Sequence, residues 1–273
     1  MSFSSLRIFV RRNKKGSGLS SLIGKRNSCE WGYKVASWNK KIDRWSLSAM
    51  KQWTKCPAQY AYQRFEKLKT PPVPALEKGT KVHSLAEAFL RGEVTGMPKE
   101  LKLFEKEFIA IRNHGFIPEA NWAVTADWQP CGWDDWDRNW CLGKTDAHFY
   151  IDHEKHLEII DFKTGRIYPD HEEGAEVYSC LGHSYYPEAE TFTVEFWYLE
   201  QGAGNIGKSP YEYDLEDIHR FKKKWERKAH RMMRSKNFKP RPGRFACNFC
   251  NFRTDRQLAD GTPGPCDAWK DIT

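Results

Sequence analysis

The spacing of apolar residues predicts helices in the first third of the chain. Ser48 is a candidate N-cap for a short helix in SLSAMKQWTK, and Pro57 suits the first turn of a second helix. The prolines of PPVP, at 71–74, interrupt the chain. In the segment EKGTKVHSLAEAFLRG, apolar residues recur at helical spacing until a glycine ends the pattern: Val82, Leu85, Ala86, Phe89, Leu90 and Gly92.

Between residues 121 and 163 the pattern changes to that of strands. The runs are NWAVTADW, CLGKTDAHFYI and LEIIDFK, and the polar turn DHEKH joins the last two into a predicted hairpin. A helix around GAEVYSCLGHSYY and two more strand-like runs, TFTVEFWYL and SPYEYDL, are expected to follow. Asp214 then caps a basic amphipathic helix whose apolar side carries Leu215, Ile218, Phe221, Trp225, Ala229 and Met232.

Positive charge gathers in two parts of the chain. The sequence has 44 Lys and Arg against 36 Asp and Glu, a net charge of +8. Twelve basic residues lie from Arg220 to Arg244 against Glu226 alone, with Phe221, Trp225 and Phe238 among them. Clustered cations favour a polyanionic partner, although a solvated helix face is the alternative.

The first 28 residues hold seven basic residues and no acidic one. This composition fits an organelle transit peptide or a flexible nucleic-acid-binding arm, and both interpretations stay open. No run of 18 apolar residues occurs, so we expect no membrane span. The 273 residues suffice for one large domain, and the eight cysteines favour metal binding or buried thiols over disulfides.

The stretch EIIDFKTGR ends an apolar strand with two opposite charges. Side chains alternate along a strand, so Asp161 and Lys163 share one face while Phe162 points to the other. A solvated ion pair is one interpretation. With Asp146 on the preceding strand, however, two carboxylates can hold Mg²⁺ or Mn²⁺ through oxygen ligands, and Lys163 can orient the attacking water. This is the arrangement that a metal-dependent phosphodiesterase needs.

At these residues the sequence resembles the PD-(D/E)xK nuclease superfamily and, within it, the RecB/AddB and CRISPR-associated RecB-like exonucleases. The matching motifs are GTKVHSLAE with His83 and Glu87, GKTD with Asp146, and DFKTG with Asp161 and Lys163. The resemblance implies a mixed α/β fold: a restriction-endonuclease-like core with a central mixed sheet flanked by helices, plus a cysteine-ligated cluster region.

The resemblance also implies roles for single residues. Asp146, Asp161 and Lys163 are the expected catalytic residues, and the expected metal site consists of His83, Asp146, Asp161 and Phe162. Read without the resemblance, His83 is more simply a packed structural residue. Glu87 and Tyr178 are expected to support the site. Where the family has a glutamine four residues before this tyrosine, the chain has Gly174, and Glu176 is a possible substitute.

Four cysteines match the family's iron–sulfur ligands. Cys56 precedes the core, whereas Cys247, Cys250 and Cys266 follow it, the first two of these as CxxC. The resemblance implies a 4Fe-4S cluster, and Zn²⁺ is the alternative, since four thiolates also suit zinc. The gap before Cys266 is longer than the family's usual spacing.

Taken together, these motifs predict a metal-dependent DNA exonuclease that acts on single strands or free DNA ends in recombination, repair or phage DNA metabolism. The alternatives are a non-catalytic nucleic-acid-binding subunit of a repair complex and a sequence-selective endonuclease. Recombination or replication proteins are possible partners, and we expect a cytoplasmic protein of a bacterial or phage-infected cell. Phosphate contacts are expected from the basic helix, through Arg220, Lys222, Lys223, Lys224, Arg227 and Lys228.

Three parts of the chain are expected: a basic arm at 1–44, a nuclease core at 45–245, and a cysteine segment at 246–273 joined to Cys56.

Overall fold

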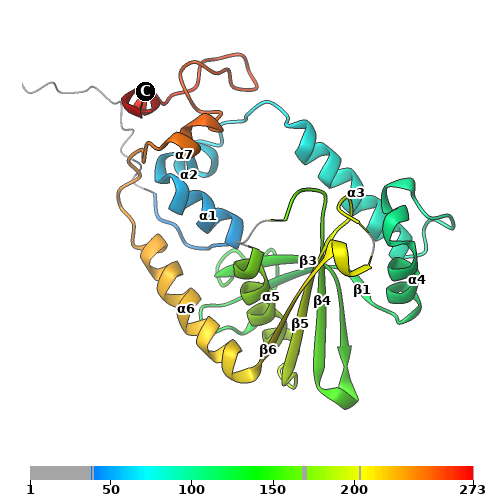
Figure 1. Ribbon diagram of the computed structural model, residues 1–273. Coiled ribbons are helices and arrows are strands. Elements are labelled where there is room, and N and C mark those ends of the chain that lie inside the picture. The colour runs from blue at the N-terminus through cyan, green and yellow to red at the C-terminus, as the bar shows by residue number, and fades with distance from the viewer. Residues whose placement is uncertain (1–37, 39, 168–170, 203, 273) are drawn as a thin grey trace, which may run out of the picture. The chain divides into compact units, whose positions relative to one another are not determined.

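A computed structural model describes residues 38, 40–167, 171–202 and 204–272. The predicted basic arm at 1–44 therefore falls almost wholly outside the described residues. Figure 1 shows a central sheet with helices on both of its faces. The helices and short 3₁₀ segments are α1 Leu47–Lys55, α2 Pro57–Arg64, α3 Pro74–Leu90, η1 Lys99–Phe104, α4 Glu105–Asn113, η2 Asp152–Glu154, α5 Glu172–Tyr185, η4 Gly204–Gly207, α6 Leu215–Met233, α7 Arg244–Asn248 and η5 Ala268–Ile272.

The sheet has six strands in the order β2-β1-β3-β4-β5-β6. Their bounds are β1 Ile117–Val124, β2 Pro130–Cys131, β3 Cys141–Ile151, β4 His156–Lys163, β5 Thr191–Tyr198 and β6 Lys208–Asp214. All neighbouring pairs are antiparallel except β4 and β5, which run parallel and are connected through α5. A parallel pair needs such a crossover. The mixed α/β fold with a central mixed sheet is thus as the sequence predicts.

Each face of the sheet has its own apolar core. Along β4, Leu157 and Ile159 pack into the core shared with α1, α5 and α6, whereas Ile160 and Phe162 pack into the core shared with α3 and α4. The alternation of a strand explains this division. Phe162 is 1% exposed, which confirms that it points away from the face of Asp161. The sheet is therefore held from both sides at the strand that carries the DFK motif.

Helix starts agree with the sequence at two places and differ at one. Pro57 begins α2, and Asp214 caps α6 in a capping box with Asp217. The prediction of Ser48 as an N-cap is wrong, since Ser46 caps α1 by accepting a hydrogen bond from the Ala49 amide at 3.3 Å. The physical reason is a bridge one residue earlier. Trp45 pairs with Cys141, so the chain is held extended until residue 46.

The last part of the chain packs against α2. A small core there contains Ala58 and Tyr62 of α2 together with Cys250, Phe252 and Leu258. Few residues of this segment are helical, and backbone hydrogen bonds such as that from the Cys266 amide to the Phe252 carbonyl add to these side-chain contacts. No helix in the described part of the chain combines the length and the apolar character needed to cross a bilayer.

Candidate active site

The β3–β4 hairpin brings the two predicted aspartates together. Its ladder ends with Ala147 opposite Ile160, and Asp146 and Asp161 are the next residue of each strand. The Phe162 amide donates to Asp146 Oδ2 at 2.6 Å, which ties the two strands at this point. The predicted hairpin is thereby confirmed.

His83 approaches Asp146 from α3. Its Nδ1 lies 2.7 Å from Asp146 Oδ1. Burial lowers the pKa of His83, but the hydrogen bond to Asp146 and the charges of Asp146 and Asp161 outweigh it, so the pKa is raised. Burial also raises the pKa of Asp146, as does the charge of Asp161. Two carboxylates with mutual repulsion in a buried place form a site that favours a cation.

Asp161 is 4% exposed and is held from two directions. The Tyr178 hydroxyl of α5 donates to its Oδ1 at 2.7 Å, and the Lys163 ammonium forms an ion pair with its Oδ2. That second oxygen is buried yet accepts no hydrogen bond among the described residues. Burial, with the charge of Asp161, raises the pKa of Tyr178 far above its usual range, so Tyr178 remains a hydrogen-bond donor.

The donor set fits a hard divalent cation in its chemistry. It offers the buried carboxylate of Asp161, the partly buried carboxylate of Asp146 and the imidazole of His83. Across the residues that the structure describes, however, no three His, Cys, Asp or Glu side chains are grouped so that they could hold a metal ion. His83, the Phe162 amide, the Tyr178 hydroxyl and the Lys163 ammonium each contact one of the four carboxylate oxygens. Binding a cation would require these partners to move.

A cavity of about 520 Å³ opens beside these residues. Its lining includes His83, Asp146, Phe162 and Lys163. Lys144 also lines it and forms an ion pair with Glu119 at 2.5 Å. Lys144 was not among the predicted site residues, although GKTD places it two residues before Asp146, on the same face of β3. This spacing in a strand could have identified Lys144 as a neighbour of the site.

The predicted supporting residues differ in where they lie. Tyr178 contacts Asp161 directly, whereas Glu87 pairs with Arg91 one turn away on α3. A Cβ built on Gly174 would lie 3.1 Å from the Phe196 ring, so a side chain there would require this ring to shift slightly. Glu176 offers no substitute. Its carboxylate accepts from Lys224 and Trp225 of α6 and faces away from the cavity.

The four predicted cluster cysteines gather around one small core. Cys250 is buried in the core formed with Tyr62, and Cys56 and Cys266 pack against it. Burial raises the pKa of Cys250, as do the nearby thiols of Cys56 and Cys247. These four, with Cys131, Cys141 and Cys180, are free thiols. The four cysteines thus converge from both ends of the described chain without forming a ligand shell.

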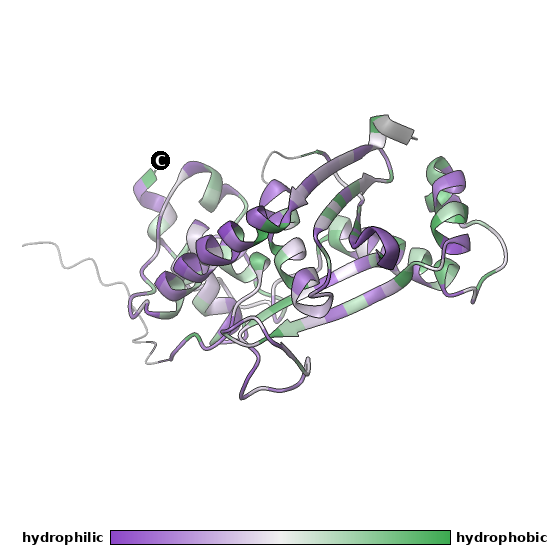
Figure 2. Ribbon diagram, turned by 90° about the horizontal axis from the view of Figure 1, so that it is seen from below, coloured by the Kyte–Doolittle hydropathy of each residue, from purple (hydrophilic) through white to green (hydrophobic). Residues whose placement is uncertain are grey.

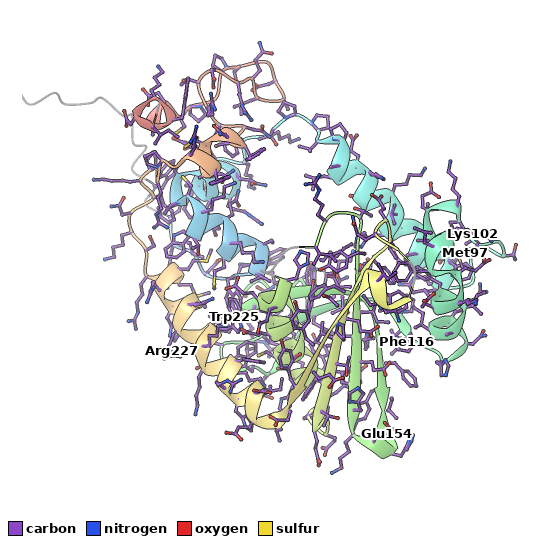
Figure 3. The ribbon with its side chains drawn as sticks, in the orientation of Figure 1. Met97, Lys102, Phe116, Glu154, Trp225 and Arg227 are labelled. Atoms are coloured by element: carbon purple, nitrogen blue, oxygen red, sulfur yellow. The ribbon has the colours of Figure 1, made fainter. Side chains whose placement is uncertain are left out.

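The basic helix α6 splits its cations between two sides. Lys222 contacts His183 at 3.1 Å, Lys224 contacts Glu176 at 2.6 Å and Lys228 contacts Glu173 at 2.7 Å. Arg220 pairs with Asp217 on the same helix. Lys223 and Arg227 are exposed, and Figure 3 shows Arg227 on the opposite side of α6 from Trp225. Only part of the predicted DNA-binding set is therefore directed to solvent.

Comparison with known proteins places this geometry in a family. The family model described as "PD-(D/E)XK nuclease superfamily" matches residues 44–135 and 143–254. A solved structure titled "Crystal structure of SSO0001" is similar over 77% of this chain and 84% of its own, with 13% identity and a TM-score of 0.37. No curated protein matches the sequence. Because the family match covers most of the chain, including the strands that carry Asp146 and Asp161, the protein belongs to the PD-(D/E)XK nuclease superfamily.

Proposed function

We propose that the protein is a Mg²⁺- or Mn²⁺-dependent DNA exonuclease of the RecB-like group, acting on single strands or free ends. The observation that carries the proposal is the pairing of Asp146 and Asp161 across one hairpin, with Lys163 beside them at a cavity. Family membership supports a nuclease with a nucleic-acid substrate. Single-strand preference and the exonuclease mode rest on the motifs of the sequence.

Asp146, Asp161, His83 and Phe162 are the residues that would hold the metal. When bound, the ion would polarise a phosphoryl oxygen and lower the pKa of a water molecule. The chain's own contribution is positioning. Phe162 donates its amide proton to Asp146, and Tyr178 donates its hydroxyl proton to Asp161, so both carboxylates are fixed in orientation.

Lys163 supplies positive charge at the point where a phosphodiester gains negative charge. Its side chain is 30% exposed and lines the cavity, so its ammonium reaches both Asp161 and the solvent side. A preorganised cation at such a place stabilises the transition state. Lys144, on the neighbouring strand at the same cavity, is suited to hold a second phosphate oxygen.

A non-catalytic nucleic-acid-binding subunit is the second candidate. Its support is the exposed positive charge of α6, which Figure 2 shows as a mostly hydrophilic helix. Binding alone does not need two neighbouring carboxylates that repel each other, however. The arrangement of Asp146 and Asp161 therefore favours catalysis.

The test uses end-labelled single-stranded and double-stranded DNA with Mn²⁺ or with EDTA. We expect stepwise shortening of single strands in Mn²⁺ and none in EDTA. Asp161→Asn and Lys163→Met should each lower the rate by about a hundredfold or more while the fold is kept. Lys155→Met is the matched control, because Lys155 pairs with Glu190 at the far turn of the hairpin. Wild-type rates in both site variants would contradict the assignment.

We also propose that Cys56, Cys247, Cys250 and Cys266 bind a 4Fe-4S cluster, or zinc in its place, as a structural tie. Three of these thiols meet at one small core, and Cys247 lies near enough to act electrostatically on Cys266, which supports the proposal. By the chain-entropy model, closing the loop from Cys56 to Cys247 would stabilise the fold by about 5 kcal/mol.

Iron, sulfide and zinc analysis of anaerobically purified protein tests the tie. Cys56→Ser should lose the bound metal and unfold at lower temperature, whereas the control Cys131→Ser should keep it. Protein with neither iron nor zinc would refute the proposal.

A further inference from the structure

Three further hollows continue the catalytic cavity along α1. The first, of about 820 Å³, shares Lys144, Lys163 and His171 with the catalytic cavity. The second, of about 520 Å³, shares Leu47 and Lys51 with the first. Neighbouring hollows therefore lie next to each other, and the series starts at the predicted catalytic lysine.

The third hollow, of about 630 Å³, completes the series at the C-terminal half of α6. It shares Trp53 and Arg231 with the second hollow. We call the three hollows beyond the catalytic cavity the trough. Its floor follows one side of α1, since Leu47, Lys51 and Lys55 are spaced four residues apart on that helix.

The charge of the trough differs sharply from that of the whole chain. Ten Lys or Arg side chains line it, and Glu173 is its one acidic residue. Glu173 already pairs with Lys228 at 2.7 Å, and Lys51 lies 4.0 Å from it. Across the chain the ratio is 44 to 36, so the trough concentrates cations far above the average. Such a surface binds a chain of phosphates.

Aromatic side chains accompany these cations. Trp133, which is 37% exposed, lines the first hollow, and Trp53 lines the second and the third. Flat aromatic rings among cations are the usual platform for unpaired bases, whereas duplex DNA keeps its bases stacked inside. The combination favours a single strand over a duplex as the occupant.

We propose that one DNA strand runs from the catalytic cavity through the trough, with bases stacked on Trp133 and Trp53 and phosphates held by Lys51, Arg231 and their neighbours. This inference rests on the proposed nuclease function, since it treats the trough as an extension of that site. The nine residues of α1 span about 13 Å, which matches about four phosphates of a stacked strand.

Binding of labelled single strands of increasing length, measured in EDTA, tests the trough without cleavage. Wild-type affinity should rise with length until the trough is filled. Trp53→Ala should weaken binding of long strands about fivefold to a hundredfold. Arg231→Met should lower the slope of log K against log salt by about 0.7. Cleavage of the shortest strands should stay as in wild type.

Two controls isolate the trough. Trp136→Ala removes a tryptophan that is 62% exposed and lines none of the trough hollows, and Lys106→Met removes an exposed cation of α4. Both should bind every length as wild type does. If Trp53→Ala misfolds, Arg231→Met carries the test alone, because Arg231 is exposed.

Three outcomes decide between the proposals. Equal affinity of wild type and both trough variants for long strands would overturn the trough. A loss of duplex binding as large as the loss of single-strand binding would overturn the single-strand assignment. If binding depends on strand length but the protein cleaves no DNA, the proposal that the trough binds a single strand is kept and the proposed nuclease function is refuted.

Discussion

Substitution of two adjacent lysines of α6 should have different effects on the stability of the fold. Lys224 makes an ion pair with Glu176, whose side chain is 6% exposed, and the neighbouring Trp225 donates to the same carboxylate at 2.9 Å. Lys223 is exposed. We predict that Lys224→Met destabilises the fold and leaves the salt dependence of DNA binding unchanged, and that Lys223→Met does not destabilise it.

The magnitude follows from the burial of the pair. Removing one member of a buried ion pair costs about 3–5 kcal/mol, because the remaining charge is left uncompensated. The Lys224 side chain is 35% exposed, and Trp225 still donates to Glu176, so the lower end applies, about 3 kcal/mol. For a domain of this size, 1 kcal/mol shifts Tm by about 2–4 °C, so Tm should fall by about 6–12 °C.

Urea unfolding and thermal melting of wild type, Lys223→Met and Lys224→Met measure these effects. An unchanged m value would show that stability, and not the unfolded state, has changed. The double variant Glu176→Leu with Lys224→Met should recover part of the loss, because no buried charge remains. Equal stability of Lys223→Met and Lys224→Met would contradict this prediction. So would a lower slope of log K for DNA binding against log salt in Lys224→Met alone.

Three further predictions concern the candidate site and helix α5. His83→Ala should raise the Mn²⁺ concentration needed for half-maximal cleavage, because imidazole suits Mn²⁺; coincident metal titrations would make His83 structural. Tyr178→Phe should lower stability by about 1–3 kcal/mol in urea unfolding, since it leaves Asp161 Oδ1 buried without its donor; no change would mean that water takes over the bond. Gly182→Ala should lower stability by about 1–3 kcal/mol despite better helix propensity, because its Cβ would lie 2.5 Å from Leu157; a melting temperature at or above that of wild type would contradict this.

The hairpin and its charges were predictable because they depend on neighbours in sequence. Asp146 and Asp161 lie 15 residues apart, and alternation along two strands with a short turn fixes their relation. The buried side of α6 was predictable for the same reason, through its helical period. Ile218, Phe221 and Trp225 are buried as expected.

The features that could not be predicted from the sequence depend on contacts between residues far apart in the chain. Lys224 and Lys228 were predicted to contact DNA, but they bind Glu176 and Glu173. These partners are 48 and 55 residues away in the sequence, so local patterns do not reveal them. The start of α1 was missed because Ser46 and Ser48 are equally good caps, and the bridge of Trp45 to Cys141 decides between them. Local helix propensity does not distinguish between two such caps.

The packing of the C-terminal segment on α2 has a consequence for synthesis of the protein. Tyr60 and Phe65 contact the Phe238 ring, and Tyr62 contacts Phe252, so apolar side chains in and next to α2 pack against residues made more than 170 positions later. On the ribosome, α1 and α2 emerge long before these partners exist. That part of the molecule can therefore complete its folding only after Phe252 has left the ribosome. Arg241, which lines the trough, comes from the same late segment. A nascent chain should thus lack a finished path for DNA.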